Sequence, residues 1–574
     1  MSIHWGGRGP GHVSRWSLAA GGFSPLSLFA ANEPGAWYDP SDLTTMFQDS
    51  AGTTPVTATG QTVGLLLDKS QGLVLGPELV TNGDFSSATG WTLGAGWSIG
   101  GGQLVGTNVT STSAATQTIT TGLGKTFLVT YTIVSITSGQ VSVGLGPSLG
   151  TTRASAGTYT EYFVGTGATN GVSVYQRVST TNAIIDNISV RELPGNHLTQ
   201  SVLSNRPIYG IEPFGGRRNF ARFTEQFDNA AWASANTGGT GVAPVVTPDA
   251  ALAPDGTMTA DRIVFSLGGG TTTADLSRRR QVTTASNGII GTGTYSFWAR
   301  TTDGVSSVNI LRENSDGFAG TQITVTGSWQ RFTVTSTTYT TGSPFGLGLR
   351  GGQTPAMPNT ADILIWGAQL ETGSTATAYQ RVTDQWNVTQ AGVPSVGYLQ
   401  FDGSDDWLVS PTITPGIDKA QVFAGVRKLS DAATGMLAET GAASPFATNG
   451  AFGMYAPITA GGANYAVISR GSSPAQANTA GSFAAPITNV LTGLGDISGD
   501  SVILRVNGTQ AASSTADQGT GNFAANPLYI GRRSGTSLPL NGRIYSLIVR
   551  FGANLSADTI TQTETWVNSK TGAY

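Results

Sequence analysis

The chain has 574 residues, which is too long for one hydrophobic core and predicts several domains. Glycine, at 79 residues, is about twice as frequent as usual, and charged residues make up only 11% of the chain, yet 39% hydrophobic residues suffice to build packed cores. A formal net charge of −4 gives no basic field to hold a nucleic acid, and the absence of cysteine excludes disulfides and thiolate metal sites.

Residues 1–32 carry aromatic and basic side chains among glycine and serine, with no acidic residue before Glu33. The pattern predicts an arm that becomes ordered on contact with a neighbouring protein, with a frayed terminus as the alternative. The residues expected to anchor this arm are Trp5, Arg8, Arg15 and Trp16. Glycine and proline interrupt the apolar stretch 16–31, which disfavours a cleaved signal peptide, and no run reaches the ~18 apolar residues that cross a bilayer.

Two later segments, 77–194 and 215–384, share a layout. Each begins with a phenylalanine followed by a tryptophan and ends in a long apolar run. Between these ends, β-branched and aromatic residues alternate with small polar ones in short runs separated by glycine, asparagine and serine, as in strands joined by tight turns. The final segment, 385–574, also has strand character and ends in a short helix that Ser556 can cap. The predicted fold class is therefore all-β: tandem antiparallel β-sandwiches with an extended N-terminal arm.

The first segment resembles a jelly-roll carbohydrate-binding module. It begins with Asn82-Gly83-Asp84-Phe85 and Trp91 and closes with Asp186-Asn187-Ile188-Ser189-Val190. The second segment departs from this pattern at its close, where Ile363-Leu364-Ile365-Trp366 stands instead. The resemblance implies that Asp84 and Asp186 are calcium ligands, and the alternative is that both cap turns.

A bound sugar would need exposed aromatic faces, because its C–H groups stack on them. The candidates are Trp91, Trp97, Trp407 and Tyr455. Each of these residues would otherwise belong to a hydrophobic core. The basic clusters Arg217-Arg218 and Arg278-Arg279-Arg280 are interpreted as solvated loop charge, with contact to an anionic glycan as the alternative.

The final segment resembles a concanavalin A-like, laminin-G type lectin domain through Phe401-Asp402-Gly403-Ser404-Asp405-Asp406 and Leu504-Arg505-Val506-Asn507-Gly508. Residues 33–70 contain Glu33-Pro34-Gly35-Ala36-Trp37-Tyr38-Asp39-Pro40 and Leu67-Asp68-Lys69-Ser70. They resemble the leader found in tailed-bacteriophage tail and fibre proteins, which there continues directly into a segment like 195–210. Here the first jelly-roll segment separates those two pieces. We therefore expect both jelly-roll segments to be insertions into one discontinuous lectin-like domain, with contacts from the leader and residues 195–210 to the final segment.

The expected divisions are the arm at 1–32, the leader at 33–76, jelly-roll module 1 at 77–194, the return segment at 195–214, jelly-roll module 2 at 215–384 and the lectin-like domain at 385–574.

The sequence carries no pattern typical of an enzyme. It has no paired carboxylates at strand spacing, no nucleophile elbow, no phosphate-binding loop and no histidine triad. The cluster Asp402, Asp405 and Asp406 lies on a turn, where capping accounts for it. We therefore expect neither catalysis nor a cofactor other than calcium.

These resemblances imply a virion tail-fibre or tail-tip protein that binds host-surface polysaccharide and mediates adsorption, made in the host cytoplasm without a signal peptide. The arm would contact other virion proteins, and a homotrimer, favoured by resemblance, would add weak sugar sites together. No nucleic acid and no membrane insertion are expected. Two alternatives stay open: a structural head-fibre or decoration protein of the virion, and a secreted polysaccharide-degrading enzyme.

Overall fold

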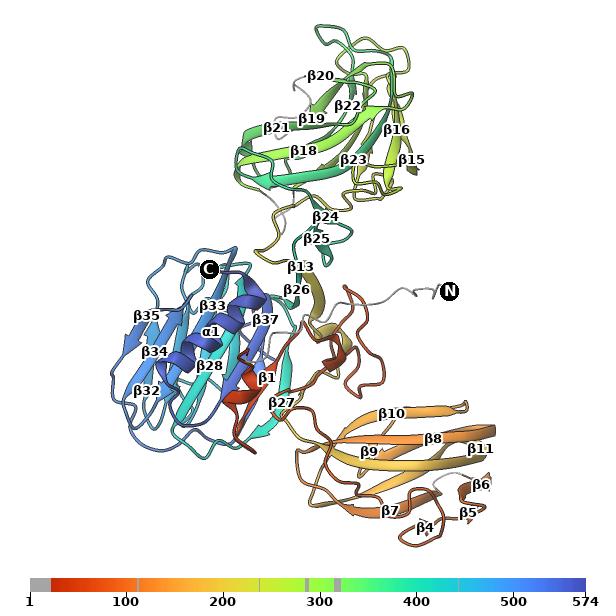
Figure 1. Ribbon diagram of the computed structural model, residues 1–574, viewed down its shortest axis with the longest axis vertical. Helices are drawn as coiled ribbons and strands as arrows, with labels where there is room; N and C mark the ends of the chain where they lie inside the picture. Colours follow the sequence, from red (N-terminus) through yellow and green to blue (C-terminus); the bar gives the residue numbers. More distant parts are fainter. Residues whose placement is uncertain (1–21, 111–112, 237, 284–288, 314–321, 442) are drawn as a thin grey trace, which may run out of the picture.

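The computed structural model describes residues 22–110, 113–236, 238–283, 289–313, 322–441 and 443–574. Figure 1 shows three bodies built from β-strands, with module 2 and module 1 at opposite ends of the long axis and the lectin-like domain beside them. The all-β prediction is confirmed. The four residues expected to anchor the arm, Trp5, Arg8, Arg15 and Trp16, lie outside the described residues.

Two antiparallel sheets form the lectin-like domain. The first contains, in order, β13 (Ile208–Pro213), β26 (Ser395–Asp402), β37 (Asn541–Arg550), β28 (Lys419–Lys428), β33 (Ile487–Asp496), β34 (Ser501–Val506) and β35 (Thr509–Ser514), with β1 (Gly35–Tyr38) paired to β37. The second contains β2 (Met46–Phe47), β3 (Leu65–Leu66), β12 (Leu198–Thr199), β27 (Leu408–Ile413), β36 (Asn526–Ile530), β29 (Met436–Thr440), β30 (Phe452–Tyr455), β31 (Ala466–Arg470) and β32 (Pro474–Asn478). Short 3-10 turns are η1 (Pro25–Leu28), η2 (Leu43–Thr45) and η3 (Leu203–Asn205).

Three separate stretches of the sequence build these two sheets. Strand β1 pairs with the second half of β37, and β26 pairs with its first half. Strand β13 pairs with β26, and β12 pairs with both β3 and β27. The contacts that the insertion hypothesis required are therefore present, and one core joins residues from all three stretches.

A buried polar cluster closes the base of module 1, where the chain leaves the lectin-like domain and returns to it. The Asp68 carboxylate accepts hydrogen bonds from the backbone N–H of Trp37 (2.8 Å) and of Asn196 (2.7 Å). The backbone N–H of Asp68 donates to Nδ1 of His197 (2.8 Å), so Nε2 carries the proton and donates to the carbonyl of Leu193 (3.1 Å). Burial lowers the pKa of His197 and raises the pKa of Asp68.

The predicted C-terminal helix is α1 (Ala557–Thr571). The Ser556 hydroxyl accepts a hydrogen bond from the backbone N–H of Thr559 (3.1 Å), as expected of the cap, and Gly572 ends the helix with a left-handed φ of 61°. Val567 packs with Phe423 on the face of the first sheet that lies away from the sandwich core. No described helix is long and apolar enough to cross a membrane.

Module 1 is a sandwich in which two long strands run through both layers. Its strands are β4 (Thr92–Leu93), β5 (Trp97–Gly100), β6 (Gln103–Val109), β7 (Ala114–Thr120), β8 (Thr126–Leu145), β9 (Ser148–Leu149), β10 (Gly157–Val164) and β11 (Thr169–Leu193). The long strands β8 and β11 pair with each other and shift register several times, so each contributes to the whole length of the module. A core of its own fills the space between the layers.

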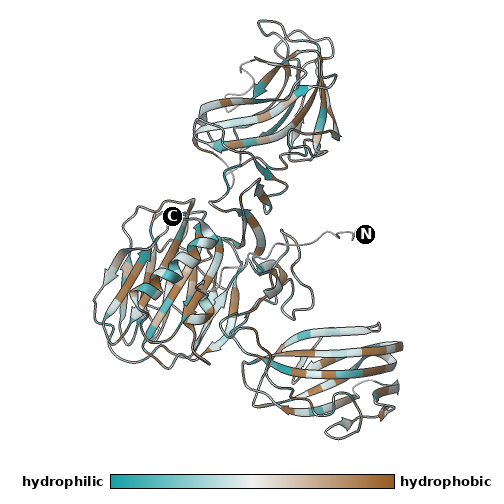
Figure 2. Cartoon of the chain, in the orientation of Figure 1, coloured by the Kyte–Doolittle hydropathy of each residue, from teal (hydrophilic) through white to brown (hydrophobic). Residues whose placement is uncertain are grey.

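Module 2 has two five-stranded sheets. One contains β14 (Ala233–Ala235), β17 (Leu276–Val282), β22 (Pro344–Arg350), β19 (Val308–Glu313) and β20 (Gln322–Val325). The other contains β15 (Val242–Ala251), β16 (Ala260–Ser266), β23 (Thr360–Thr372), β18 (Gly291–Thr301) and β21 (Gln330–Tyr339). Figure 2 shows hydrophobic and hydrophilic residues alternating along many strands, as expected where one face of a sheet is covered.

The arginine run of module 2 is not loop charge, so that interpretation is wrong. Arg278, Arg279 and Arg280 lie on β17, and alternate residues of a strand point to opposite faces. The buried Glu313 carboxylate pairs with Arg278 (2.7 Å) and Arg280 (3.2 Å), while Nε of Arg279 donates to the carbonyl of Phe227 (2.7 Å). These arginines hold module 2 together.

A short hairpin, β24 (Gln380–Val382) and β25 (Val388–Gln390), joins module 2 to the lectin-like domain (Figure 1). The backbone N–H of Ile211, on β13, donates to the carbonyl of Trp386 in the hairpin turn (2.8 Å). On the other side, the Asn219 side chain donates to the carbonyls of Gln380 (2.8 Å) and Ala368 (3.0 Å). The hairpin is thus hydrogen-bonded to both bodies that it separates.

Candidate functional site

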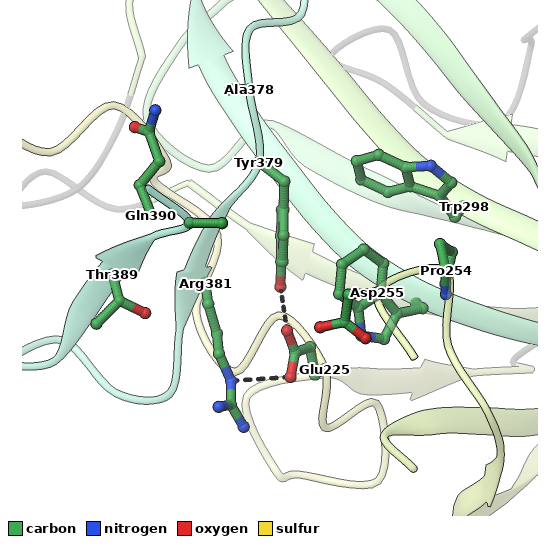
Figure 3. Close-up of a pocket in the computed structure, with 11 residues that line it drawn as sticks. Glu225, Pro254, Asp255, Trp298, Ala378, Tyr379, Arg381, Thr389 and Gln390 are labelled. Atoms are coloured by element: carbon green, nitrogen blue, oxygen red, sulfur yellow. Dashed lines mark hydrogen bonds and ion pairs between the residues drawn. The ribbon is translucent and has the colours of Figure 1, made fainter. Parts of the chain in front are cut away.

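A pocket of about 480 Å³ lies between the body of module 2 and the β24–β25 hairpin (Figure 3). Strands β18 and β23 contribute Trp298 and Trp366, and the loop between β15 and β16 contributes Asp255. The hairpin side contributes Tyr379 and Arg381. Two strands, one loop and the hairpin, which lie far apart in the sequence, therefore contribute residues to one pocket.

Three aromatic rings form one wall of this pocket. Trp298 and Trp366 are directly opposite each other on neighbouring strands, with ring centroids 5.2 Å apart, and Tyr379 lies 4.6 Å from Trp366 and 5.6 Å from Trp298. The Arg331 guanidinium lies 4.4 Å from the Trp298 ring centroid. The rings belong to a small cluster distinct from the main core of module 2.

A β-bulge at Gly367 makes this aromatic wall possible. The register between β18 and β23 shifts here, because Ser296 pairs with Gln369 while Trp298 pairs with Trp366. Gly367 has a left-handed φ of 66°, and a Cβ added there would lie 2.9 Å from the Trp298 ring. Only glycine therefore fits against the ring without strain.

Glu225 is the buried charged residue of the pocket, and its two oxygens are both engaged. Oε2 pairs with Nε of Arg381 (2.8 Å), and Oε1 accepts a hydrogen bond from the Tyr379 hydroxyl (3.1 Å), as the dashed lines in Figure 3 show. Burial raises the pKa of Glu225, and the Arg381 charge opposes that shift. Burial, with the Glu225 charge, also holds the pKa of Tyr379 well above its usual value.

Asp255 is the exposed acidic residue at the edge of the pocket. Its Oδ1 accepts hydrogen bonds from the backbone N–H (3.0 Å) and the hydroxyl (2.6 Å) of Thr257, which fix the carboxylate on its loop. Its charge also raises the pKa of Glu225, so the two carboxylates act on each other. With Thr389 and Gln390 on the hairpin, the edge of the pocket is polar.

Three of the four aromatic residues predicted to face a sugar are core residues instead. Trp91 and Trp97 are 7% and 6% exposed in the core of module 1, and Tyr455 is fully buried with its hydroxyl 2.6 Å from Glu439. A buried ring offers no face to a ligand, so these three residues occupy the core position given above as the alternative, and the sugar-stacking role is wrong for them. Trp407 is half-buried and lines a second hollow, of about 560 Å³, between module 1 and the lectin-like domain.

The two aspartates implied as calcium ligands make turn hydrogen bonds. Asp84 is exposed and accepts from the backbone N–H of Ser86 (3.2 Å), and Asp186 accepts from the backbone N–H of Asn187 (2.7 Å). Neither belongs to a group of three or more potential metal ligands among the described residues. Both aspartates thus make the local hydrogen bonds that the turn-capping alternative expects, and the calcium role stays a prediction.

The three carboxylates that do gather in the described part of the chain are Asp402, Asp405 and Asp406. Asp402 accepts from the backbone N–H of Ser404 (2.7 Å), and Asp406 accepts from the backbone N–H of Asp402 (3.0 Å), so the cluster caps its turn as expected. Burial and the neighbouring Asp402 charge raise the pKa of Asp406 to about 7.

The pocket is not among the sites expected from the sequence, although the sequence contains a signal for it. In β18, Tyr295, Phe297 and Ala299 point into the core, which places Trp298 on the opposite face by the two-residue period. Trp298 thus points away from the core while its neighbours point into it. A second tryptophan, Trp366, stands next to Gly367 in the apolar run of β23. Together they indicate an aromatic pair outside the core.

No family model and no curated protein matches the chain. Among solved structures it is similar to the CBM40 of Ruminococcus gnavus IT-sialidase bound to alpha2,3 sialyllactose, with 19% identity and a TM-score of 0.22 over 26% of this chain and 84% of that one. It is also similar to the tandem CBM22-1-CBM22-2 of Paenibacillus barcinonensis Xyn10C, with 11% identity and a TM-score of 0.23 over 55% of this chain and 100% of that one. A third is the heptameric SAP-like pentraxin of Limulus polyphemus, with 13% identity and a TM-score of 0.24 over 29% of this chain and 79% of that one. Two of these three structures are carbohydrate-binding modules. TM-scores of 0.22 to 0.24 do not assign a function to this chain.

Proposed function

We propose that this chain is a non-catalytic glycan-binding protein of a bacteriophage virion, a tail-fibre or tail-tip protein that attaches to host-surface polysaccharide. The observation that carries the proposal is the pocket of module 2, with its aromatic wall and polar edge. The virion assignment is supported by the resemblance of residues 33–70 to the leader of phage tail and fibre proteins.

The chemistry of the pocket suits a sugar ring. Aromatic faces attract the C–H groups of a pyranose, while a few fixed polar groups at the edge accept and donate hydrogen bonds to its hydroxyls. Trp298 and Tyr379 are half-buried and so retain exposed ring surface, and Asp255 and Gln390 lie at the polar edge. A volume of about 480 Å³ is within the range of small-ligand sites.

The same contacts favour binding over catalysis. A hydrolytic site needs one carboxylate free to donate a proton and another free to attack or to activate water. The buried Glu225 has Oε1 engaged by Tyr379 and Oε2 by Arg381. Of the carboxylates in the described lining, this leaves Asp255 with an uncommitted oxygen. One free carboxylate fits recognition of a hydroxyl group.

Weak single sites would become useful through repetition. A homotrimer anchored to the particle by its N-terminal arm would present three copies of the pocket at once, and simultaneous engagement raises the overall affinity well above that of one site.

The test is binding of the full chain to an array of host-envelope polysaccharides. Trp298→Ala removes one stacked ring, worth about 1.4 kcal/mol, and is expected to weaken binding about tenfold. Phe446→Ala is the matched control, because Phe446 is an aromatic residue of the lectin-like domain, 44% exposed and outside the pocket. Equal binding by wild type and Trp298→Ala would contradict the assignment of the site.

Two further measurements separate the alternatives. Electron microscopy of labelled virions that places the protein on the head, together with adsorption that antibodies fail to block, would favour the head-fibre or decoration role. Release of reducing sugar from host polysaccharide by the purified chain would favour the degrading enzyme.

A further inference from the structure

The charges that line the module 2 pocket are unbalanced. Among the described residues, three charged side chains line it: Glu225, Asp255 and Arg381. Glu225 and Arg381 form an ion pair at 2.8 Å and so neutralise each other. Asp255 has no cationic partner among the described residues, so the lining carries one net negative charge at its open edge.

We propose that this pocket selects neutral or amino-bearing sugars and rejects acidic ones, a specificity that rests on the proposed glycan-binding function. Thr257 occupies Oδ1 of Asp255, and Oδ2 makes no hydrogen bond or ion pair within the described residues. That oxygen is free to accept a hydrogen bond from a sugar hydroxyl or from a protonated amine. Hydrogen bonds to a carboxylate are stronger than those between neutral groups.

The positive charge of Arg381 does not offset the repulsion between Asp255 and an acidic ligand. Its Nε is held by Glu225, a residue that is only 5% exposed and therefore depends on that cation. A sugar carboxylate that used the other guanidinium N–H groups of Arg381 would share that positive charge with Glu225 and would face Asp255 at the same time. Two anions brought together at short range repel each other, so uronic and sialic acids are disfavoured.

The other polar groups of the edge fit neutral ligands. Thr389 presents a hydroxyl from the hairpin. Oε1 of Gln390 accepts hydrogen bonds from Arg218 and Gln380, so Gln390 offers a ligand only the N–H groups of its uncharged amide, and Arg218 lies behind it. Cationic donors that commonly recognise a carboxylate are limited to Arg381 in the described lining. The pocket is therefore built around one accepting carboxylate, an aromatic wall and neutral donors.

The experiment measures binding of glucose, glucosamine and glucuronate to the full chain by NMR or calorimetry, at mildly acid pH where the glucosamine amine is protonated. Glucosamine is expected to bind about two- to fivefold more tightly than glucose, the range of an exposed ion pair, and glucuronate more weakly than either. Added salt should reduce the preference for glucosamine because it screens exposed charges. Asp255→Asn keeps the Thr257 contacts through its amide oxygen and should remove the preference.

Asp558→Asn, on the exposed first turn of α1, is the charge-matched control and should leave the preference unchanged. Absence of binding by all three sugars would overturn both the glycan-binding function of this pocket and the specificity. Tighter binding of glucuronate, or a preference for glucosamine that persists in Asp255→Asn, would overturn the specificity alone.

Discussion

Trp91 in module 1 and Trp232 in module 2 occupy corresponding places near the start of their modules. In both, the indole N–H donates to a backbone carbonyl nine residues earlier, that of Asn82 (3.1 Å) or of Phe223 (2.9 Å). Both rings pack in the core against a phenylalanine. Trp298 and Trp366 of module 2 instead form an aromatic pair outside the main core, on the wall of a pocket. The tryptophan that modules 1 and 2 share near their starts is thus a core residue. The candidate site is built from two tryptophans of module 2 that lie outside this shared pattern.

The largest expected effect concerns the shared tryptophans. Trp232→Ala should lower the free energy of unfolding of module 2 by about 3–5 kcal/mol, because it removes a fully buried aromatic ring. Trp298→Ala should cost less stability and weaken sugar binding about tenfold. Chemical denaturation of the two variants, followed by a binding titration, checks this contrast. Equal losses of stability would remove the distinction between structural and ligand-facing tryptophans.

Gly367→Ala sharpens the comparison by disturbing only the wall of the module 2 pocket. A methyl group at a left-handed φ, 2.9 Å from the Trp298 ring, should cost about 1–3 kcal/mol and displace the ring, so sugar affinity should fall with stability. Gly373→Ala is the matched control, because Gly373 also has a positive φ, 97°, but its Cβ would meet nothing within 4 Å. If both variants bind sugar as the wild type does, the bulge does not support the site.

The junctions of the two modules should differ in their response to acid. His197 at the base of module 1 has a pKa lowered by burial, so the stability that depends on neutral His197 is present above pH ~6.5 and is lost as the pH falls. We expect the module 1 junction to weaken by at most about 1.4 kcal/mol per pH unit below that value, and by less where protonation of Asp68, whose pKa burial raises, favours the folded state. The module 2 hairpin contains no histidine. Limited proteolysis should release module 1 faster at acid than at neutral pH, while release of module 2 should change less. His197→Gln should reduce the pH dependence of module 1 release. Equal release of both modules at acid pH would contradict the predicted difference.

The sequence predicted the architecture better than the site. Runs such as Tyr295-Ser296-Phe297-Trp298-Ala299 follow a two-residue period that predicts strands, and the separated leader motifs predicted a discontinuous domain. Sequence pattern does not reveal burial of single rings, so it leaves Trp91 and Tyr455 as candidates for either a sugar site or a core, and the structure places both in a core. The pocket depends on a one-residue bulge and on a hairpin that brings Tyr379 to strands far away in sequence, and both are tertiary features.

The most direct test of the account is a binding titration of host-surface polysaccharide with the full chain, comparing wild type, Trp298→Ala and Phe446→Ala. The account predicts measurable binding by wild type and Phe446→Ala and about tenfold weaker binding by Trp298→Ala. Equal affinity of all three chains, or release of sugar fragments during the titration, would contradict a passive glycan site on module 2.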